Sequence, residues 1–197
     1  MWGSIVLISG GCFLLVMIAT GLRIRLAGGD FKGRSPFGRP LFLTGKAAMG
    51  ILWGMAFWRA VTVGLAAAAP SGWPDRVGAV VFAMGSALAM AALLDLGSES
   101  RFGLPERDCR LKTSGLYAWS RHPMYTGFYL MALGAGLYVF HPAGLVLLVP
   151  ALYLYHRTAL AEERFLAGRF DKAWRDYTNR VGRYGGPARF FRSPRSN

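Results

Sequence analysis

Residues 123–155 read PMYTGFYLMALGAGLYVF, then His141 and Pro142, then AGLVLLVPALYLY. Neither apolar run contains a charged residue. The residue before a proline is biased away from the helical region, so the His141-Pro142 pair indicates a break between two helices. The stretch therefore predicts a tight hairpin of two apolar helices.

The rest of the chain has the same apolar character. Of its 197 residues, 53% are hydrophobic, and the mean hydropathy is +0.32; a soluble domain needs less apolar surface for its core. Further apolar runs occupy residues 2–22, 41–69 and 77–96. A run near 20 residues with few charges crosses about 30 Å of hydrocarbon. We therefore expect an all-α polytopic membrane protein with about five transmembrane helices, the last two forming the hairpin, followed by a cytoplasmic helical tail.

Two details of these runs are open to interpretation. Lys46 and Arg59 blur the ends of the second run, so Arg59 either lies deep in that span or marks its outer edge. The first run has no basic residues before it, and we read it as a retained anchor rather than a cleaved signal peptide. Small residues at helical spacing predict close helix packing, Gly50 with Gly54 on the second span and Gly85 with Ala89 on the third.

Lysine and arginine are distributed unevenly between the loops. The basic segments follow the first, third and fifth runs, and they include Arg23, Arg25, Lys32, Arg34, Arg39, Arg101, Arg107, Arg110, Lys112, Arg121 and residues 157–195. The connections at residues 70–76 and 141–142 carry little net charge. Because cytoplasmic loops hold the positive charge, the N-terminus is expected outside and the C-terminus in the cytoplasm of a bacterial or archaeal plasma membrane.

Several functional classes are disfavoured by composition. The net charge of +13 is spread over loops that flank membrane spans, where topology and anionic head groups account for it, so we expect no nucleic-acid partner. Cys12 lies in a span and Cys109 in a cytoplasmic loop, which argues against a disulfide or a metal cluster. No glycine-rich GxGxxG loop follows a strand pattern, so a soluble Rossmann-type enzyme is excluded.

Two polar clusters border the hairpin. Arg121 and His122 come directly before Pro123, a natural first helical residue, so they lie at a helix mouth that suits an anionic group. Tyr125 and Tyr129 share one face of the following helix. Beyond the fifth run come Glu162 and Glu163, which the hairpin returns to the same membrane face, so the two clusters can meet. Each cluster alone also fits an ordinary role, as topology anchor, helix cap or dipole partner.

The motifs around these clusters resemble a known family. From about Leu96 to Tyr184 the chain is similar to the isoprenylcysteine carboxyl methyltransferases and related phospholipid methyltransferases, through LKTSGLYAWSRHPMYTGFY and EERFLAGRFDKAWRDYTNRVGRY. Leu116 and Lys112 depart from the family pattern. The positions that match it are Arg121, His122, Pro123, Tyr125, Glu162, Glu163, Leu166, Phe170 and Tyr177.

This resemblance implies a membrane-embedded methyltransferase that uses S-adenosyl-L-methionine and no metal. We expect catalytic roles for Arg121 and Glu163. The residues expected to bind the cofactor are His122, Tyr125, Glu162, Glu163, Leu116 and Tyr117. We expect one domain over residues 1–197, with a three-helix part at 1–96, the catalytic core at 97–184 and a basic tail at 185–197.

The methyl acceptor follows less directly. A lipid-facing site suits a lipophilic carboxylate such as that of isoprenylcysteine, with membrane lipids and a lipophilic or prenylated substrate as partners. A phospholipid amine is the alternative acceptor. Outside methyl transfer, the alternatives are an NADPH-dependent sterol-type membrane reductase and a nonenzymatic scaffold or transporter.

Overall fold

The structure is a computed structural model that describes residues 1–28, 35–63, 72–97 and 110–186. These residues form five α-helices and a 3-10 turn: α1 (Trp2–Leu26), α2 (Arg39–Thr62), α3 (Trp73–Leu96), η2 (Gly115–Ala118), α4 (Pro123–Val139) and α5 (Pro142–Arg180). Arg101, Arg107, Cys109 and residues 187–197, which carry some of the sequence predictions, lie outside the described residues.

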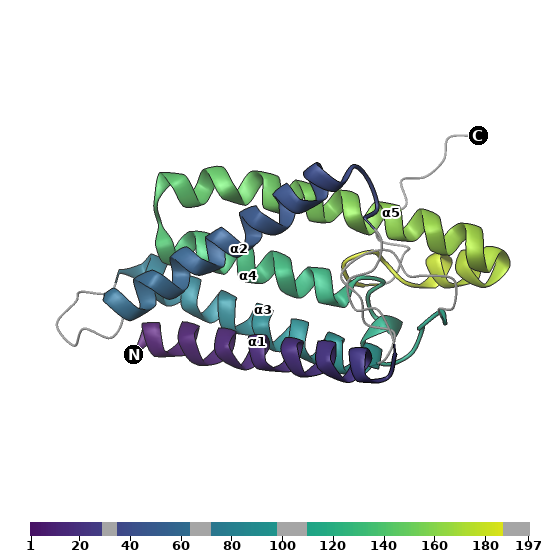
Figure 1. Cartoon of the computed structure of the whole chain (residues 1–197), viewed down its shortest axis with the longest axis horizontal. Coiled ribbons are helices and arrows are strands. Elements are labelled where there is room, and N and C mark those ends of the chain that lie inside the picture. Colours follow the sequence, from purple (N-terminus) through teal and green to yellow (C-terminus); the bar gives the residue numbers. More distant parts are fainter. Residues whose placement is uncertain (29–34, 64–71, 98–109, 187–197) are drawn as a thin grey trace.

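The helices form an elongated bundle with alternating directions (Figure 1). α4 packs against α2, α3 and α5 and so occupies the centre of the bundle, while α1 covers α2 and α3. The ends of α1 and α3 and the starts of α2 and α4 lie toward the same end of the bundle, the end where the C-terminal part of α5 lies (Figure 1). This arrangement brings the described basic segments to one end, and the orientation of that end in the membrane stays a prediction.

The membrane character expected from the sequence is confirmed. Four helices, α1, α2, α3 and α5, are long and apolar enough to cross a membrane. The fourth apolar run is also a helix, but α4 has only 17 residues. At 1.5 Å per residue it measures about 26 Å, which is near the lower limit for a transmembrane helix.

α5 differs from the expected short span with a separate tail helix. The 39 residues of α5 are two helices joined across a kink at Asp171, where φ is 35° and ψ is −100°, and the first of them continues unbroken from the apolar span through Glu162 and Glu163. The residues between 156 and 167 include no glycine or proline, and they are mostly good helix formers, so nothing ends the helix at the membrane border. Beyond the break the chain turns back toward the bundle (Figure 1).

Close packing of α3 on α4 depends on glycine. A Cβ atom added to Gly85 would lie 2.5 Å from the backbone nitrogen of Met131 and 2.7 Å from the carbonyl oxygen of Gly127. One added to Gly127 would lie 2.7 Å from the backbone nitrogen of Ala89. The predicted role of Gly85 and Ala89 is therefore confirmed.

The corresponding prediction for α2 is wrong. A Cβ atom on Gly50 or Gly54 would meet nothing within 4 Å. α2 instead buries a face that includes Met49, Leu52 and Ala56. Spacing alone shows that Gly50 and Gly54 share a face, but it does not show which face of an apolar helix packs inward.

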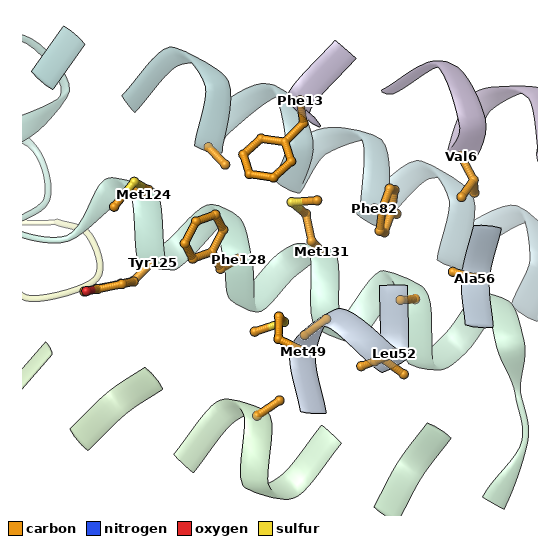
Figure 2. Close-up of a cluster of buried hydrophobic side chains, with 14 of the residues drawn as sticks. Val6, Phe13, Met49, Leu52, Ala56, Phe82, Met124, Tyr125, Phe128 and Met131 are labelled. Atoms are coloured by element: carbon orange, nitrogen blue, oxygen red, sulfur yellow. The ribbon is translucent and has the colours of Figure 1, made fainter. Parts of the chain in front are cut away.

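α4 is fixed in place by aromatic contacts. The ring of Phe128 lies 5.8 Å from those of Phe13 and Trp53, in edge-to-face arrangements. Figure 2 shows Phe13, Phe128 and Met131 together in this core, with the hydroxyl of Tyr125 directed away from them. This packing holds the first turn of α4, and Tyr125 with it, at the end of the bundle.

Arg59 lies in the last turn of α2, at the other end of the bundle. Its Nη2 atom is 2.8 Å from Oδ1 of Asp75, in the first turn of α3, and its guanidinium lies 5.2 Å from the ring centre of Tyr138. Of the two interpretations, the structure supports the edge position. An open groove of about 630 Å³ is lined by Arg59 and His141 at this end, and none of the predicted site residues lines it.

Candidate active site

The approach to the site is anchored on the end of α3. Leu116 N donates a hydrogen bond of 2.8 Å to Oδ2 of Asp95, and Lys112 Nζ lies 3.0 Å from Oδ1 of the same residue. Gly115, which has a positive φ of 64°, leaves room for the Asp95 carboxylate where any Cβ would collide with it. Lys112, which departs from the family pattern, thus has a structural partner here.

The two motif regions are joined by backbone hydrogen bonds. Arg121 N donates to the carbonyl oxygen of Gly182 at 2.9 Å, and His122 N donates to that of Arg183 at 3.0 Å. Tyr177 OH donates to the carbonyl oxygen of Tyr117 at 2.6 Å. The segment after α5 therefore lies against the start of α4, where the sequence predicts a helix mouth open to an anion.

Glu163 is the most heavily paired side chain of the site. Arg183 binds it with two donors, Nε to Oε1 at 2.9 Å and Nη2 to Oε2 at 2.8 Å. Arg121 Nη1 lies 3.3 Å and His122 Nε2 3.2 Å from Oε1. A buried carboxylate with this many partners fixes the positions of the groups around it.

His122 caps α4 and is 6% exposed. Burial lowers the pKa of His122 below its ordinary value, more than its hydrogen bond to Glu163 raises it. The imidazole is therefore neutral at pH 7. Because a carboxylate only accepts hydrogen bonds, the ring proton is assigned to Nε2, which leaves Nδ1 as an acceptor.

Glu162 differs from its neighbour in its partners. Tyr125 OH donates to Oε1 at 2.5 Å, and Tyr125 is 4% exposed and stacked on the His122 ring at 5.4 Å. The nearest atom of His122 to Oε2 is Nδ1, at 3.7 Å, which is too long for a hydrogen bond. Glu162 thus keeps the capacity to accept a hydrogen bond from a ligand. It lies inside α5 and not at the start of a helix.

The remaining predicted residues lie around this centre. Tyr117 is buried, and its carbonyl oxygen accepts the hydrogen bond from Tyr177 that ties the two motif regions together. Leu116 packs at its margin against the hydrophobic core. The structure therefore gathers Arg121, His122, Tyr125, Glu162 and Glu163, with Tyr117 and Leu116 as neighbours.

Sequence reasoning missed the contributions of Arg183 and Tyr184. Tyr184 OH lies 2.6 Å from Nδ1 of His156 and 3.0 Å from the hydroxyl of Tyr129, so it ties the C-terminal segment to α5 and α4. Both residues belong to the GRY stretch directly after α5. The GRY stretch just after the last helix is the sequence signal that could have drawn attention to these two residues.

The site has the donor and acceptor set that an amino-acid ligand requires. Nε of Arg121 is buried and has no hydrogen-bond partner within the described part of the chain. The nearest atom of His122 to Oε2 of Glu162 lies 3.7 Å away, too far for a hydrogen bond. A buried cationic donor binds a carboxylate, and a carboxylate binds an ammonium. The methionine part of S-adenosyl-L-methionine carries both groups, so the residues present fit this cofactor.

Comparison with known proteins agrees with this geometry. The family model for phospholipid methyltransferases matches residues 74–173, about half of the chain. The chain belongs to the phospholipid methyltransferase family. The match begins at residue 74, near the start of α3. The family region of this methyltransferase therefore extends further toward the N-terminus than the motifs from Leu96 onward indicated.

Three curated relatives carry the name protein-S-isoprenylcysteine O-methyltransferase. The one from Saccharomyces cerevisiae is 36% identical over 78 residues, which cover 39% of this chain and 33% of the relative. The one from Tribolium castaneum is 28% identical over 114 residues, which cover 56% of this chain and 41% of the relative. The one from Homo sapiens is 27% identical over 113 residues, which cover 55% of this chain and 40% of the relative. The chain spans about a third to two fifths of the length of these relatives. The resemblance seen in the sequence is thereby confirmed.

Proposed function

We propose that the chain transfers a methyl group from S-adenosyl-L-methionine to a lipophilic carboxylate at the membrane border, as in carboxyl methylation of an isoprenylated cysteine. The family match and the names of the relatives support methyl transfer over a sterol-type reductase or a nonenzymatic scaffold. The observation that carries the proposal is the contrast between the two adjacent glutamates. Glu163 is paired with two arginines and His122, whereas Glu162 accepts a hydrogen bond from Tyr125 and can accept another from a ligand.

S-adenosyl-L-methionine bound here would supply a methyl group on a positively charged sulfur; the acceptor oxygen would bond to the methyl carbon as the sulfur–carbon bond breaks, and S-adenosylhomocysteine would leave. Glu162 accepts a hydrogen bond from the ammonium of the cofactor, and Tyr125 holds Glu162 in place. Arg121 would bind the carboxylate of the cofactor through Nε, and Glu163 holds the guanidinium in place through Nη1. The chain thus aligns the reactants and keeps water out, the main tasks in a direct displacement.

We choose a carboxylate acceptor because it does not have to lose a proton before it is methylated. A carboxylate is already ionised at neutral pH, so its methylation needs no general base. A phospholipid amine, the second candidate because of the family name, must lose a proton. The base nearest to Glu162 is Nδ1 of His122. Its ring is buried, hydrogen-bonded to Glu163 and stacked on Tyr125, so it is poorly placed to take a proton from an amine acceptor.

Calorimetric titration with S-adenosylhomocysteine tests the cofactor site, because the product binds without turnover. We expect saturable binding that Glu162→Gln weakens by about tenfold or more, since a charge-assisted hydrogen bond contributes roughly 1.5–3 kcal/mol. Asp176→Asn, on an exposed part of the same helix, is the matched control and should bind as the unmodified protein does. Equal binding by the Glu162 variant would refute the assignment.

A further inference from the structure

α2 also contributes a side chain to the site. Lys46, in its first half, lies in a narrow crevice between α2 and the α4–α5 hairpin, with room of about 10 Å³, enough for one water molecule. The other residues lining the crevice are Phe42, Gly45, Met124, Tyr125, Leu154, Tyr155 and Thr158. The crevice therefore shares Tyr125 with the cofactor site.

The close approach of α2 to α5 explains how Lys46 reaches this place. A Cβ atom on Gly45 would lie 2.7 Å from Cβ of Leu154, so only glycine allows the two helices to touch here. Lys46 is the next residue, and its Nζ lies 4.4 Å above the ring centre of Phe42. Tyr125, which lines the same crevice as Lys46, is hydrogen-bonded to Glu162.

A topology anchor is the ordinary role for a lysine in a membrane helix, but Lys46 does not match that role well. It lies about two turns inside α2, whose first residue is Arg39, and it is half-buried against the hairpin. Anchoring lysines extend to the interface at helix ends. An ionisable side chain held inside the bundle has a high desolvation cost and indicates a site.

The charges of the site suggest what Lys46 binds. Glu162 and Glu163 face three cations among the described residues, namely Lys46, Arg121 and Arg183. These cations attract an acceptor with a negative head group and repel one with an ammonium.

We propose that the ammonium of Lys46 binds the carboxylate of the methyl acceptor and makes the site selective for acidic lipophilic acceptors. This inference rests on the proposed function and names its substrate class. The head group replaces the water-sized volume beside Tyr125. The acceptor's apolar chain remains in the bilayer, because α2 and α5, which form two walls of the crevice, are both membrane-spanning helices.

Direct binding measurements in lipid nanodiscs test the proposal without relying on turnover. The probes are N-acetyl-S-farnesyl-cysteine and its carboxamide, which differ only in the charge of the head group. We expect the unmodified protein to bind the acid at least about tenfold more tightly than the amide. Lys46→Met should remove this preference by weakening acid binding alone, and Lys46→Arg should restore most of it. Lys172→Met, on the exposed end of α5, should leave it unchanged.

The outcomes separate the inference from the function on which it rests. If Lys46→Met keeps the preference for the acid, or weakens both probes equally, Lys46 does not bind the carboxylate. If the unmodified protein shows no preference, the inference also fails. Titration with S-adenosylhomocysteine should give saturable binding of equal affinity for the unmodified protein and for Lys172→Met. Absence of cofactor binding in the unmodified protein would instead refute the proposed function.

Discussion

Replacing Glu163 with glutamine should destabilise the folded protein and impair cofactor binding together. The substitution removes the charge that pairs with Arg183 and Arg121, and it leaves these guanidinium groups partly buried without their counterion. Breaking a buried ion pair costs about 3–5 kcal/mol. We therefore expect a clear fall in the thermal unfolding temperature and at least a tenfold loss of affinity for S-adenosylhomocysteine.

Glu162→Gln provides the contrast. Glutamine retains an oxygen for the hydroxyl of Tyr125, and Glu162 has no such pair of arginines, so affinity should fall while the unfolding temperature changes much less. Unfolding followed by tryptophan fluorescence, beside calorimetric titration, measures both quantities on the same samples. If Glu163→Gln were as stable as the unmodified protein, its role in holding the site together would be wrong.

Gly85→Ala should be strongly destabilising, although it adds only a single methyl group. The new Cβ atom would lie 2.5 Å from the backbone of α4, where no side-chain rotation can relieve the contact, so the two helices must move apart. Overpacking of this kind costs about 1–3 kcal/mol. The measurement is the free energy of unfolding in mixed detergent micelles.

The matched control for this change is Gly50→Ala on α2. Its Cβ atom would meet nothing within 4 Å, and alanine favours a helix over glycine by roughly 0.5–1 kcal/mol, so stability should stay equal or rise. Equal losses from the two substitutions would show that the α3–α4 contact is not the tight interface described.

Much of the fold follows from local signals in the sequence. The apolar runs and the His141-Pro142 break predict the helices and the hairpin, because a bilayer leaves few alternatives to helix. The extent of α5 was not predictable in the same way, since the end of the apolar residues does not end a helix. Gly50 and Gly54 show a related limit, because in lipid both faces of a helix can be apolar.

The candidate site could be predicted in part. Arg121, His122 and the two glutamates are brought together by the hairpin, as their order and spacing indicate. The contrast between Glu162 and Glu163 was not visible, because it depends on Arg183, which reaches Glu163 only after the chain turns back at Asp171. Lys46 could not be assigned from sequence either, because its place is set by the contact of Gly45 with Leu154.

The most direct test of the account is transfer of a labelled methyl group. Purified protein in nanodiscs would receive S-adenosyl-L-methionine tritiated in the methyl group, together with N-acetyl-S-farnesyl-cysteine. We expect a labelled product from which base releases the label as methanol, because the product is a methyl ester. Label that resists base and follows an amine-bearing phospholipid, or no transfer by protein that binds S-adenosylhomocysteine, would contradict it.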